Sequence, residues 1–353
     1  MKASESNPNY PSKVREMTNY TIREIKKVCK DIGPRPSGEE NERKAQDYVA
    51  DSMSKVADSV VKERFELHPK AFMGWVPLDV ILMTISVILT LLSYFDVLPS
   101  ASTAFSVVSV VLTSLAIIFT FFEFLLYKKF LDPFFPKRET YNVVCTRKAA
   151  GETKRRIVFS GHIDSAYEWY FTHLGGGKLL TTMIALAFGA IAITLAASIV
   201  SFFDVPNGVR VTAIVVLFVC LIPILMCSKF VNWKLCVPGA NDNLTGVFAS
   251  MSVLRYMAAN DIRFENTEVV AMITDGEEAG LRGCKDWAKK HKDEYTNTGV
   301  ETAVLCVDTL TDLEYLNVYS RDMTGTVKHS QPFSQLVMES AKEAGHNDLK
   351  FAN

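Results

Sequence analysis

Long runs of uncharged residues constrain this chain more than any other feature of its sequence. Residues 97–122 and 179–203 contain no charged side chain, and 211–228 is a third such run. The hydrocarbon core of a bilayer needs about 20 apolar residues per helix, so the first two runs are long enough to span it. The third run contains Pro223, which we expect to kink the helix. These runs favour membrane-spanning helices.

A shorter run, 80–95, lies between Asp79 and Asp96. It spans a bilayer only if those acids lie at the interface. Short connectors pair the four runs into two helical hairpins, at 77–127 and 179–228. The alternative is four core helices of a large soluble protein, but such helices normally keep a polar face, which these runs lack. We therefore expect a multi-pass integral membrane protein with about four spans, in contact with a lipid bilayer.

Charge, cysteine spacing and missing motifs exclude several classes of protein. The net charge is −1 and no basic patch is interleaved with aromatic residues, so a nucleic-acid partner is not expected. The seven cysteines show no Cys-x-x-Cys spacing, which favours reduced thiols over a disulfide framework or a zinc ribbon. The His-Glu-x-x-His and Gly-x-Ser-x-Gly motifs, which are typical of two classes of hydrolase, are absent from the sequence.

The polar remainder of the chain predicts mixed helix and strand. Apolar residues spaced by three and four over 12–32 predict a helix that ends at Gly33. Ser37–Glu40 has the pattern of a capping box and would open a second helix that runs to about Ala57. Alternating polar and apolar residues over 59–67 predict a strand.

Four further apolar segments predict strands, at 141–145, 156–160, 267–273 and 303–307. Three of them run into chemically active side chains: His162 and Asp164, Glu277 and Glu278, and Asp308. A Gly-Ala turn after the second hairpin brings in Asp242. The carboxyl ends of parallel strands meet at one edge of a sheet, so these distant residues could share one site.

Each of these residues also has a purely structural interpretation. A lone histidine after a strand is usually a satisfied polar residue, and Asp308 could cap a turn. Asn241–Asn243 is good turn material by itself, and paired acids such as Glu277 and Glu278 suit the first turn of a helix. These interpretations would have to hold together at four separate strand or turn ends, which favours the shared site.

One imidazole with several carboxylates is a ligand set suited to zinc, manganese or cobalt. Because an aspartate can bridge two ions, the set fits a two-metal hydrolase, in which the ions lie about 3.5–4 Å apart. Asp164 lies two residues beyond His162 on an extended segment and can therefore hold the other ring nitrogen of that histidine. One of the paired glutamates is then free to act as a general base.

These residues and their order resemble the M28 zinc peptidases, which include bacterial aminopeptidases and plant and animal carboxypeptidase relatives. The motifs that carry the resemblance are Ile32–Gly38, Gly161–Ser165, Gly239–Gly246 and Thr274–Gly283. The resemblance covers most of the chain outside the apolar runs.

The resemblance implies an α/β/α sandwich with a mixed, mostly parallel sheet, here interrupted by the two transmembrane hairpins. The peptidase domain would be discontinuous, at 12–72, 131–176 and 230–353. The implied roles are zinc ligation by His162 and Asp308 at one ion and Glu278 at the other, a bridging Asp242, Glu277 as general base and Asp164 as the orienting carboxylate.

The chain departs from the family pattern at its C-terminus. The family's last zinc ligand is a histidine well beyond the position of Asp308, whereas this chain ends at Asn353. His329 and His346 come too early to match it. We therefore expect a truncated sequence in which the second zinc lacks one ligand, although two ions are expected in the complete protein. The chain as given could lack activity.

The predicted function is that of a zinc metallopeptidase, an aminopeptidase that hydrolyses the N-terminal peptide bond of peptide substrates. One alternative is a single-zinc enzyme like glutaminyl cyclase, using Asp242, Glu278 and a missing histidine. Another is a membrane scaffold that has kept the fold and lost turnover. Intact His162, Asp164 and Asp308 favour the two-metal peptidase over both.

Charge predicts the orientation of the spans. Basic residues flank them on the side of the predicted peptidase domain, whereas the connectors at the other end contain only Arg210. The positive-inside rule then places the peptidase domain in the cytoplasm. The flanking residues are Lys62, Arg64, Lys70, Lys128, Lys129, Lys137, Arg138, Lys178, Lys229 and Lys234.

Overall fold

A computed structural model describes residues 9–296, 298–322 and 324–352. Contacts divide the chain into two compact units. We call residues 1–69, 137–166 and 236–353 the sheet unit, and residues 70–136 and 167–235 the helical unit.

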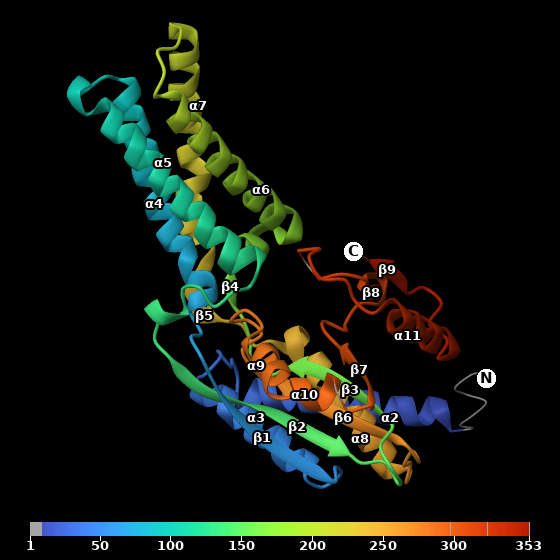
Figure 1. Ribbon diagram of the computed structural model, residues 1–353. Helices are drawn as coiled ribbons and strands as arrows, with labels where there is room; N and C mark the ends of the chain where they lie inside the picture. Colours follow the sequence, from blue (N-terminus) through green and yellow to red (C-terminus); the bar gives the residue numbers. More distant parts are fainter. Residues whose placement is uncertain (1–8, 297, 323, 353) are drawn as a thin grey trace. The chain divides into compact units, whose positions relative to one another are not determined.

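The sheet unit is built on a five-stranded sheet in the order β1-β2-β6-β3-β7 (Figure 1). The strands are β1 (Ser59–Leu67), β2 (Arg138–Arg147), β3 (Arg155–His162), β6 (Thr267–Thr274) and β7 (Glu301–Cys306). β2 pairs antiparallel with β1 and β6, whereas β3 pairs parallel with β6 and β7. The three parallel strands are those that run into the predicted site residues.

The expected α/β fold with a mixed, mostly parallel sheet is confirmed, since four of the five strands run in one direction and β2 runs against them. Two of the four pairings are antiparallel. The reason is that the chain leaves β1 at Leu67 and returns beside it, with Arg138 of β2 paired directly to Leu67. β1 and β2 thus form a hairpin whose connection is the first pair of apolar helices. The second interruption of the sheet unit is residues 167–235. The chain also leaves and returns at one place here, because the Val237 amide donates to the Ala166 carbonyl at 2.9 Å.

Helices cover both faces of the sheet. α2 (Tyr10–Asp31), α3 (Glu40–Met53) and α8 (Thr245–Ala259) pack on one face, and α9 (Arg282–Lys290) and α10 (Lys292–Thr296) on the other. The sequence of β6 is apolar throughout because both faces of this strand are buried. Its odd-numbered Val269, Ala271 and Ile273 enter one core, whereas the even-numbered Val270 and Met272 enter the other.

Smaller elements complete the sheet unit. They are the π-helical turn Ala240–Leu244, the 3-10 turn Leu313–Tyr315, helix α11 (Gln331–Glu343), and the short parallel strands β8 (Asn317–Tyr319) and β9 (Lys350–Ala352).

The expected capping box at Ser37–Glu40 is wrong. α3 begins at Glu40 with Glu39 as its N-cap, and no side chain caps it. The Ser37 hydroxyl instead donates to the buried carboxylate of Asp164 at 2.7 Å. A charged acceptor binds a hydroxyl more strongly than a neutral one does, so the buried carboxylate takes this donor away from the helix end.

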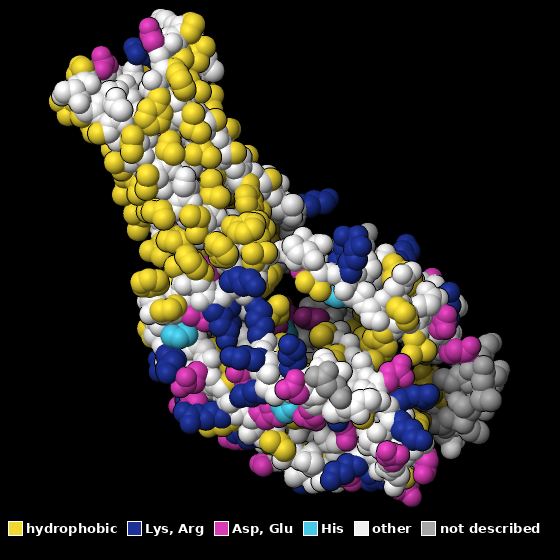
Figure 2. Space-filling view, in the orientation of Figure 1, with side chains coloured by type: hydrophobic (Ala, Val, Ile, Leu, Met, Phe, Trp, Pro, Cys, Tyr) yellow, Lys and Arg dark blue, Asp and Glu magenta, His cyan; other side chains and the backbone are white. Residues whose placement is uncertain are grey.

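The helical unit consists mainly of four helices, α4 (Ala71–Tyr94), α5 (Ser102–Phe119), α6 (Tyr170–Val200) and α7 (Asn207–Met226). All four are long and apolar enough to cross a membrane. The π-helical segment Thr120–Leu125 continues α5. Figure 2 shows hydrophobic side chains over most of the outer surface of these helices. The expected pairing of four apolar helices into two hairpins is confirmed.

Short elements flank these helices. They are the 3-10 turns Pro99–Ala101, Asp132–Phe134 and Cys227–Lys229, and the strands β4 (Tyr167–Trp169) and β5 (Val231–Cys236), which form a two-stranded sheet.

Small hydroxyl side chains fill the interior of the helical unit. Ser86 of α4 bonds Ser109 and Thr113 of α5, and Thr90 bonds Ser109 and Ser198 of α6, at 2.6–2.7 Å. All of these side chains are buried. In lipid, small residues let helices approach closely and hydroxyl groups bond across the interface. We call these buried hydroxyl side chains the hydroxyl seam. Their hydrogen bonds hold α4, α5 and α6 together and specify a packing that the apolar runs alone would leave open.

His291 predicts a pH dependence of stability in the sheet unit. Its two ring nitrogens lie 2.7 Å from Glu294 and 2.8 Å from Glu63. Burial lowers the pKa of His291, but these two contacts outweigh it and raise the pKa above its ordinary value. A raised pKa stabilises the fold fully below the unfolded value of about 6.5, and this stabilisation is lost as the pH rises through the folded value.

We expect His291→Gln to lower the melting temperature of the detergent-solubilised chain by about 2–4 °C at pH 6. The difference from the parent chain should shrink as the pH is raised toward 9 and the parent histidine loses its proton. The exposed His346→Gln is the matched control and should change little at either pH. An equal loss at both pH values would contradict the assignment.

Candidate metal centre

The end of β3 places His162 and Asp164 at the edge of the sheet. An added Cβ on the preceding Gly161 would lie 2.6 Å from the backbone of Gly246 and Val247 at the start of α8. Only glycine allows this approach, because real Cβ atoms do not come so close. The contact brings the β3 end against the turn that carries Asp242.

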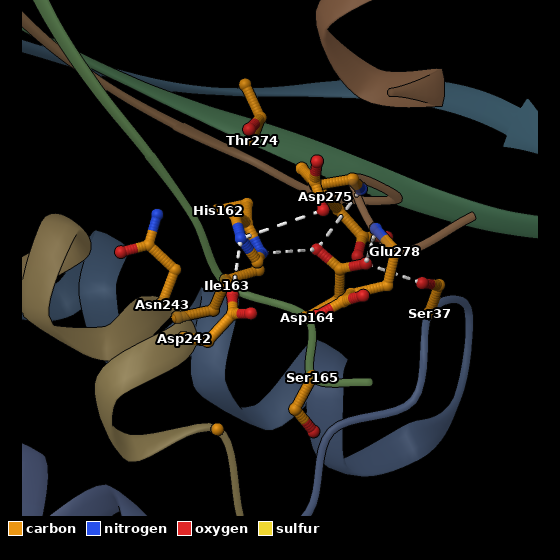
Figure 3. Close-up of polar contacts among 12 residues, drawn as sticks. Ser37, His162, Ile163, Asp164, Ser165, Asp242, Asn243, Thr274, Asp275 and Glu278 are labelled. Carbon is orange, nitrogen blue, oxygen red and sulfur yellow. Dashed lines mark hydrogen bonds and ion pairs between the residues drawn. The ribbon is translucent and has the colours of Figure 1, made fainter. Parts of the chain in front are cut away.

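Two groups of donor atoms converge on His162. The first group adds Asp242 and Asp308, and the second adds Glu277 and Glu278. The Nε2 atom of His162 lies 3.1 Å from Asp242, 3.7 Å from Asp308 and 3.8 Å from Glu277. Figure 3 shows His162 between Asp242 on one side and Asp164 on the other. The structure therefore brings together all six residues that the sequence singles out.

The six residues differ in their access to solvent. His162 and Asp164 are buried, with 3% and 0% of their surface exposed. The side chains of Asp242 and Asp308 are about half exposed, at 53% and 50%, and that of Glu277 is 33% exposed. The buried pair forms the floor of the site, and the exposed acids form a rim that a solute can reach.

Asp164 connects three parts of the chain. One carboxylate oxygen accepts the Ser37 hydroxyl and, at 3.0 Å, the backbone amide of Glu278. The other accepts the backbone amide of Glu277 at 3.3 Å and lies 3.3 Å from Nδ1 of His162. This carboxylate therefore fixes the histidine ring and the turn that carries both glutamates, as an orienting residue should.

Electrostatics make the bare cluster unfavourable. Burial raises the pKa of Glu278 well above its ordinary value and that of Glu277 to about 7, and the neighbouring carboxylates add to both shifts. Burial lowers the pKa of His162. Its contacts with Asp164, Asp242 and Asp308 outweigh burial and raise the pKa to well above the ordinary value. Within the described residues, the ion pairs of Asp164, Asp242, Glu277 and Asp308 all involve His162. One imidazole cannot neutralise so many acids.

A second layer of polar groups supports the glutamate turn from below. Asp275 and Glu42 are both fully buried. Burial, together with neighbouring carboxylates, raises the pKa of Asp275 to about 8 and that of Glu42 well above its ordinary value. Asn142 accepts the Asp275 backbone amide at 3.1 Å, and Thr140 donates to Glu42 at 2.9 Å. These contacts tie the turn to β2 and α3.

Arg35 joins the two sides of the second interruption. Its guanidinium is fully buried and donates to the carbonyls of Ile163 at 2.8 Å, Pro238 at 2.9 Å and Gly239 at 3.1 Å. The Ser165 amide in turn donates to the Arg35 carbonyl at 3.0 Å. The metal motif before the interruption is thereby held against the one after it.

Sequence reasoning assigned no role in the site to Arg35, Ser37 or Asn243. The Asn243 side chain donates to the Val307 carbonyl at 2.9 Å and accepts the Gly246 amide at 2.8 Å, so it links the Asp242 turn to the strand end that carries Asp308. Arg35, Ser37 and Asn243 all lie within the motifs that carry the M28 resemblance. Their position within these motifs was the one sequence signal that could have identified them as site residues.

The residues present fit a divalent metal ion. Nε2 of His162 and Oε1 of Glu278 are buried and lack a hydrogen bond of good geometry. Buried polar atoms are normally satisfied, so unsatisfied ones at a cluster of acids call for an explanation. Imidazole nitrogen and carboxylate oxygen are both good zinc ligands. A bound cation would coordinate the unpartnered atoms and also neutralise the excess negative charge of the acids.

Comparison with known families identifies part of the chain. Residues 227–350 match the model of peptidase family M28. We call this matched stretch the M28 region. This region contains Asp242, Glu277, Glu278 and Asp308, while His162 precedes it along the chain. A comparison with curated proteins gave no match.

The solved structures to which this chain is similar include two kinds of enzyme. One is glutaminyl cyclase from Tannerella forsythia, at 12% identity and a TM-score of 0.48, covering 96% of this chain and 74% of that one. Another is BSAP, a zinc aminopeptidase from Bacillus subtilis, at 11% identity and a TM-score of 0.48, covering 95% and 79%. Glutaminyl cyclase from Fimbriiglobus ruber matches at 12% identity and a TM-score of 0.42 over 85% of this chain, which spans 64% of that enzyme.

Proposed function

We propose that this protein is a metal-dependent aminopeptidase of the M28 type, anchored in a membrane by its four apolar helices. The observation that carries the proposal is the convergence of His162 with Asp242, Asp308, Glu277 and Glu278 at one sheet edge, four of these five residues lying in the M28 region. The peptidase domain comprises 12–72, 131–176 and 230–353, although residue 353 lies outside the described part. Hairpins 77–127 and 179–228 interrupt it.

In this proposal His162 and Asp308 would hold one zinc ion, Glu278 would hold a second, and Asp242 would be a ligand shared by both. Bound zinc would supply Lewis acidity, which polarises a carbonyl group and lowers the pKa of water. The half-exposed side chains of Asp242 and Asp308 leave the site accessible to a peptide end.

Glu277 moves the proton. Its carboxylate accepts a proton from the attacking water and returns it to the nitrogen of the leaving amine, so that the peptide bond breaks and the carboxylate is regenerated. Asp164 acts as the positioning residue, because it holds the His162 ring and the Glu277 backbone.

Two alternatives are distinguished by their products. A glutaminyl-cyclase-like enzyme would release ammonia from an N-terminal glutamine and leave the peptide chain intact. A scaffold would bind partners without turnover. Release of free amino acids from a peptide with an unblocked N-terminus, but not from its acetylated form, would distinguish the aminopeptidase from both.

We expect Glu277→Gln to lower peptide hydrolysis by roughly 10²–10⁴-fold while leaving zinc content unchanged, because glutamine cannot accept the proton but preserves the shape of the side chain. The measurement is release of amino acids by the purified full chain, with zinc determined on the same sample. Glu294→Gln, at an exposed acid outside the site, is the matched control. Retained activity in the Glu277 variant would refute the proposed role of this residue.

We also propose that the sheet unit lies in the cytoplasm, on the basis of the basic residues that flank the spans. A protease added outside intact cells should then leave the sheet unit uncut and should reach only the connectors near 96–101 and 204–210. Cleavage within the sheet unit in intact cells would show the opposite orientation and would leave the chemical proposal unaffected.

A further inference from the structure

Six exposed lysines lie at one end of the helical unit. They come just before α4, after the π-helical continuation of α5, beyond the break in the first part of α6, and in the segment that follows α7. Thr90 and Ser198, near the other ends of α4 and α6, are hydrogen-bonded, so the two hairpins point in the same direction. We call these six residues the lysine collar: Lys70, Lys128, Lys129, Lys178, Lys229 and Lys234.

One apolar cluster joins the separate segments of the collar. The rings of Phe72 and Tyr127 stack with their centroids 5.1 Å apart, and the Nζ atom of Lys70 lies 5.8 Å from the centre of the Trp233 ring. Five of the six lysines lie one or two residues along the chain from a member of this cluster. Those members are Phe72, Tyr127, Leu179, Phe230 and Trp233. The collar lysines therefore lie around a single cluster.

Tryptophan indicates that this end of the unit lies at a membrane surface. Three of the four tryptophans of the chain belong to the same cluster, namely Trp75, Trp169 and Trp233. Tryptophan and tyrosine are enriched at the boundary between hydrocarbon and head groups. A lysine beside them can lay its apolar stem along the cluster and keep its ammonium group among the head groups.

The collar lysines have no acidic partners. Among the side chains that the structure describes, none of the six forms an ion pair. Of the four acids in this part of the unit, Asp79, Glu123 and Asp132 are buried. The fourth, Glu168, accepts a hydrogen bond from Asn232 at 3.0 Å. The positive charge of the collar is therefore available to an anion from outside the chain.

We propose that the lysine collar binds the phosphate head groups of anionic phospholipids. The ammonium groups donate to phosphate oxygens, while the acyl chains lie along the apolar outer surface of the helices. This inference rests on the membrane anchoring in the proposed function, and it is independent of the peptidase chemistry.

The position of the collar favours a lipid over other anions. Groups of about four to eight basic residues beside a membrane span attract anionic lipids, because the surface of a bilayer that contains such lipids is negative. A zwitterionic lipid is a poorer partner, since its own ammonium group repels the collar. An acidic peptide would match the charge but would make no use of the apolar surface next to it.

The test uses the full chain in phosphatidylcholine vesicles that contain a trace of spin-labelled phosphatidylglycerol or spin-labelled phosphatidylcholine. Electron spin resonance measures the fraction of each label that the protein immobilises. We expect phosphatidylglycerol to be preferred about fivefold at low salt, the ratio that one lysine near a bilayer surface supplies. In about 1 M NaCl, where the Debye length is about 3 Å, the preference should fall toward equality.

The failures of this inference and of membrane anchoring are distinguishable. Equal immobilisation of the two labels at low salt would overturn the lipid preference alone. Absence of any immobilised label would overturn membrane anchoring and this inference with it. Loss of the preference in inorganic phosphate, but not in NaCl of equal ionic strength, would show a general phosphate site and contradict a lipid partner. The same loss with an oligoglutamate peptide would show an acidic protein partner instead.

Variants of the collar separate its charge from the packing of the helices. Lys→Gln at all six positions should abolish the preference, whereas Lys→Arg at the same positions should preserve it. Unchanged immobilisation of phosphatidylcholine shows that the helices remain assembled. The matched control is Lys→Gln at six exposed lysines of the sheet unit, which should keep the full preference: Lys26, Lys30, Lys55, Lys154, Lys289 and Lys342. An undiminished preference in the collar Lys→Gln variant would contradict the proposal.

Discussion

The buried carboxylate of Asp164 is the constraint on which the rest of the site depends. An uncompensated charge in a protein interior costs several kcal/mol, so a fully buried carboxylate persists only when donors surround it. Here the donors come from three separate segments: the Ser37 hydroxyl, the His162 ring and the backbone amides of the glutamate turn. To satisfy this one group, the chain must bring the N-terminal motif, the end of β3 and the end of β6 together.

The two interruptions are compatible with that assembly because each closes on itself. Leu67 pairs with Arg138 across the first, and Ala166 bonds Val237 across the second. Arg35 strengthens the second closure by donating to carbonyl groups on both sides of it. A charged donor that serves several carbonyls is not easily replaced, because each lost bond leaves a buried acceptor unsatisfied. Local closure lets apolar helices be inserted without altering the sheet register.

Much of this architecture could be predicted from the sequence because it depends on local patterns. Alternation predicts β1 with its observed bounds, and apolar runs that end in acids predict the strands that deliver His162, Glu277 and Asp308. The pairing direction of β2 could not be predicted this way, because it depends on where the chain re-enters the sheet. The use of Ser37 could not be predicted either, since a capping box and a donor to a remote carboxylate have the same local sequence. The interior hydroxyl seam depends on which helix faces meet, and the near-uniform apolar runs do not specify that.

The central claim is that imidazole and carboxylate groups, not thiolates, hold a metal at the sheet edge. The chain offers an internal competitor, because Cys306 lies two residues from Asp308 and zinc binds thiolates well. Zinc-edge X-ray absorption of the purified full chain distinguishes the two ligand sets. The account predicts bound zinc with nitrogen and oxygen neighbours only, at about 2.0–2.2 Å. A sulfur neighbour at about 2.3 Å, or no zinc bound at all, would contradict it.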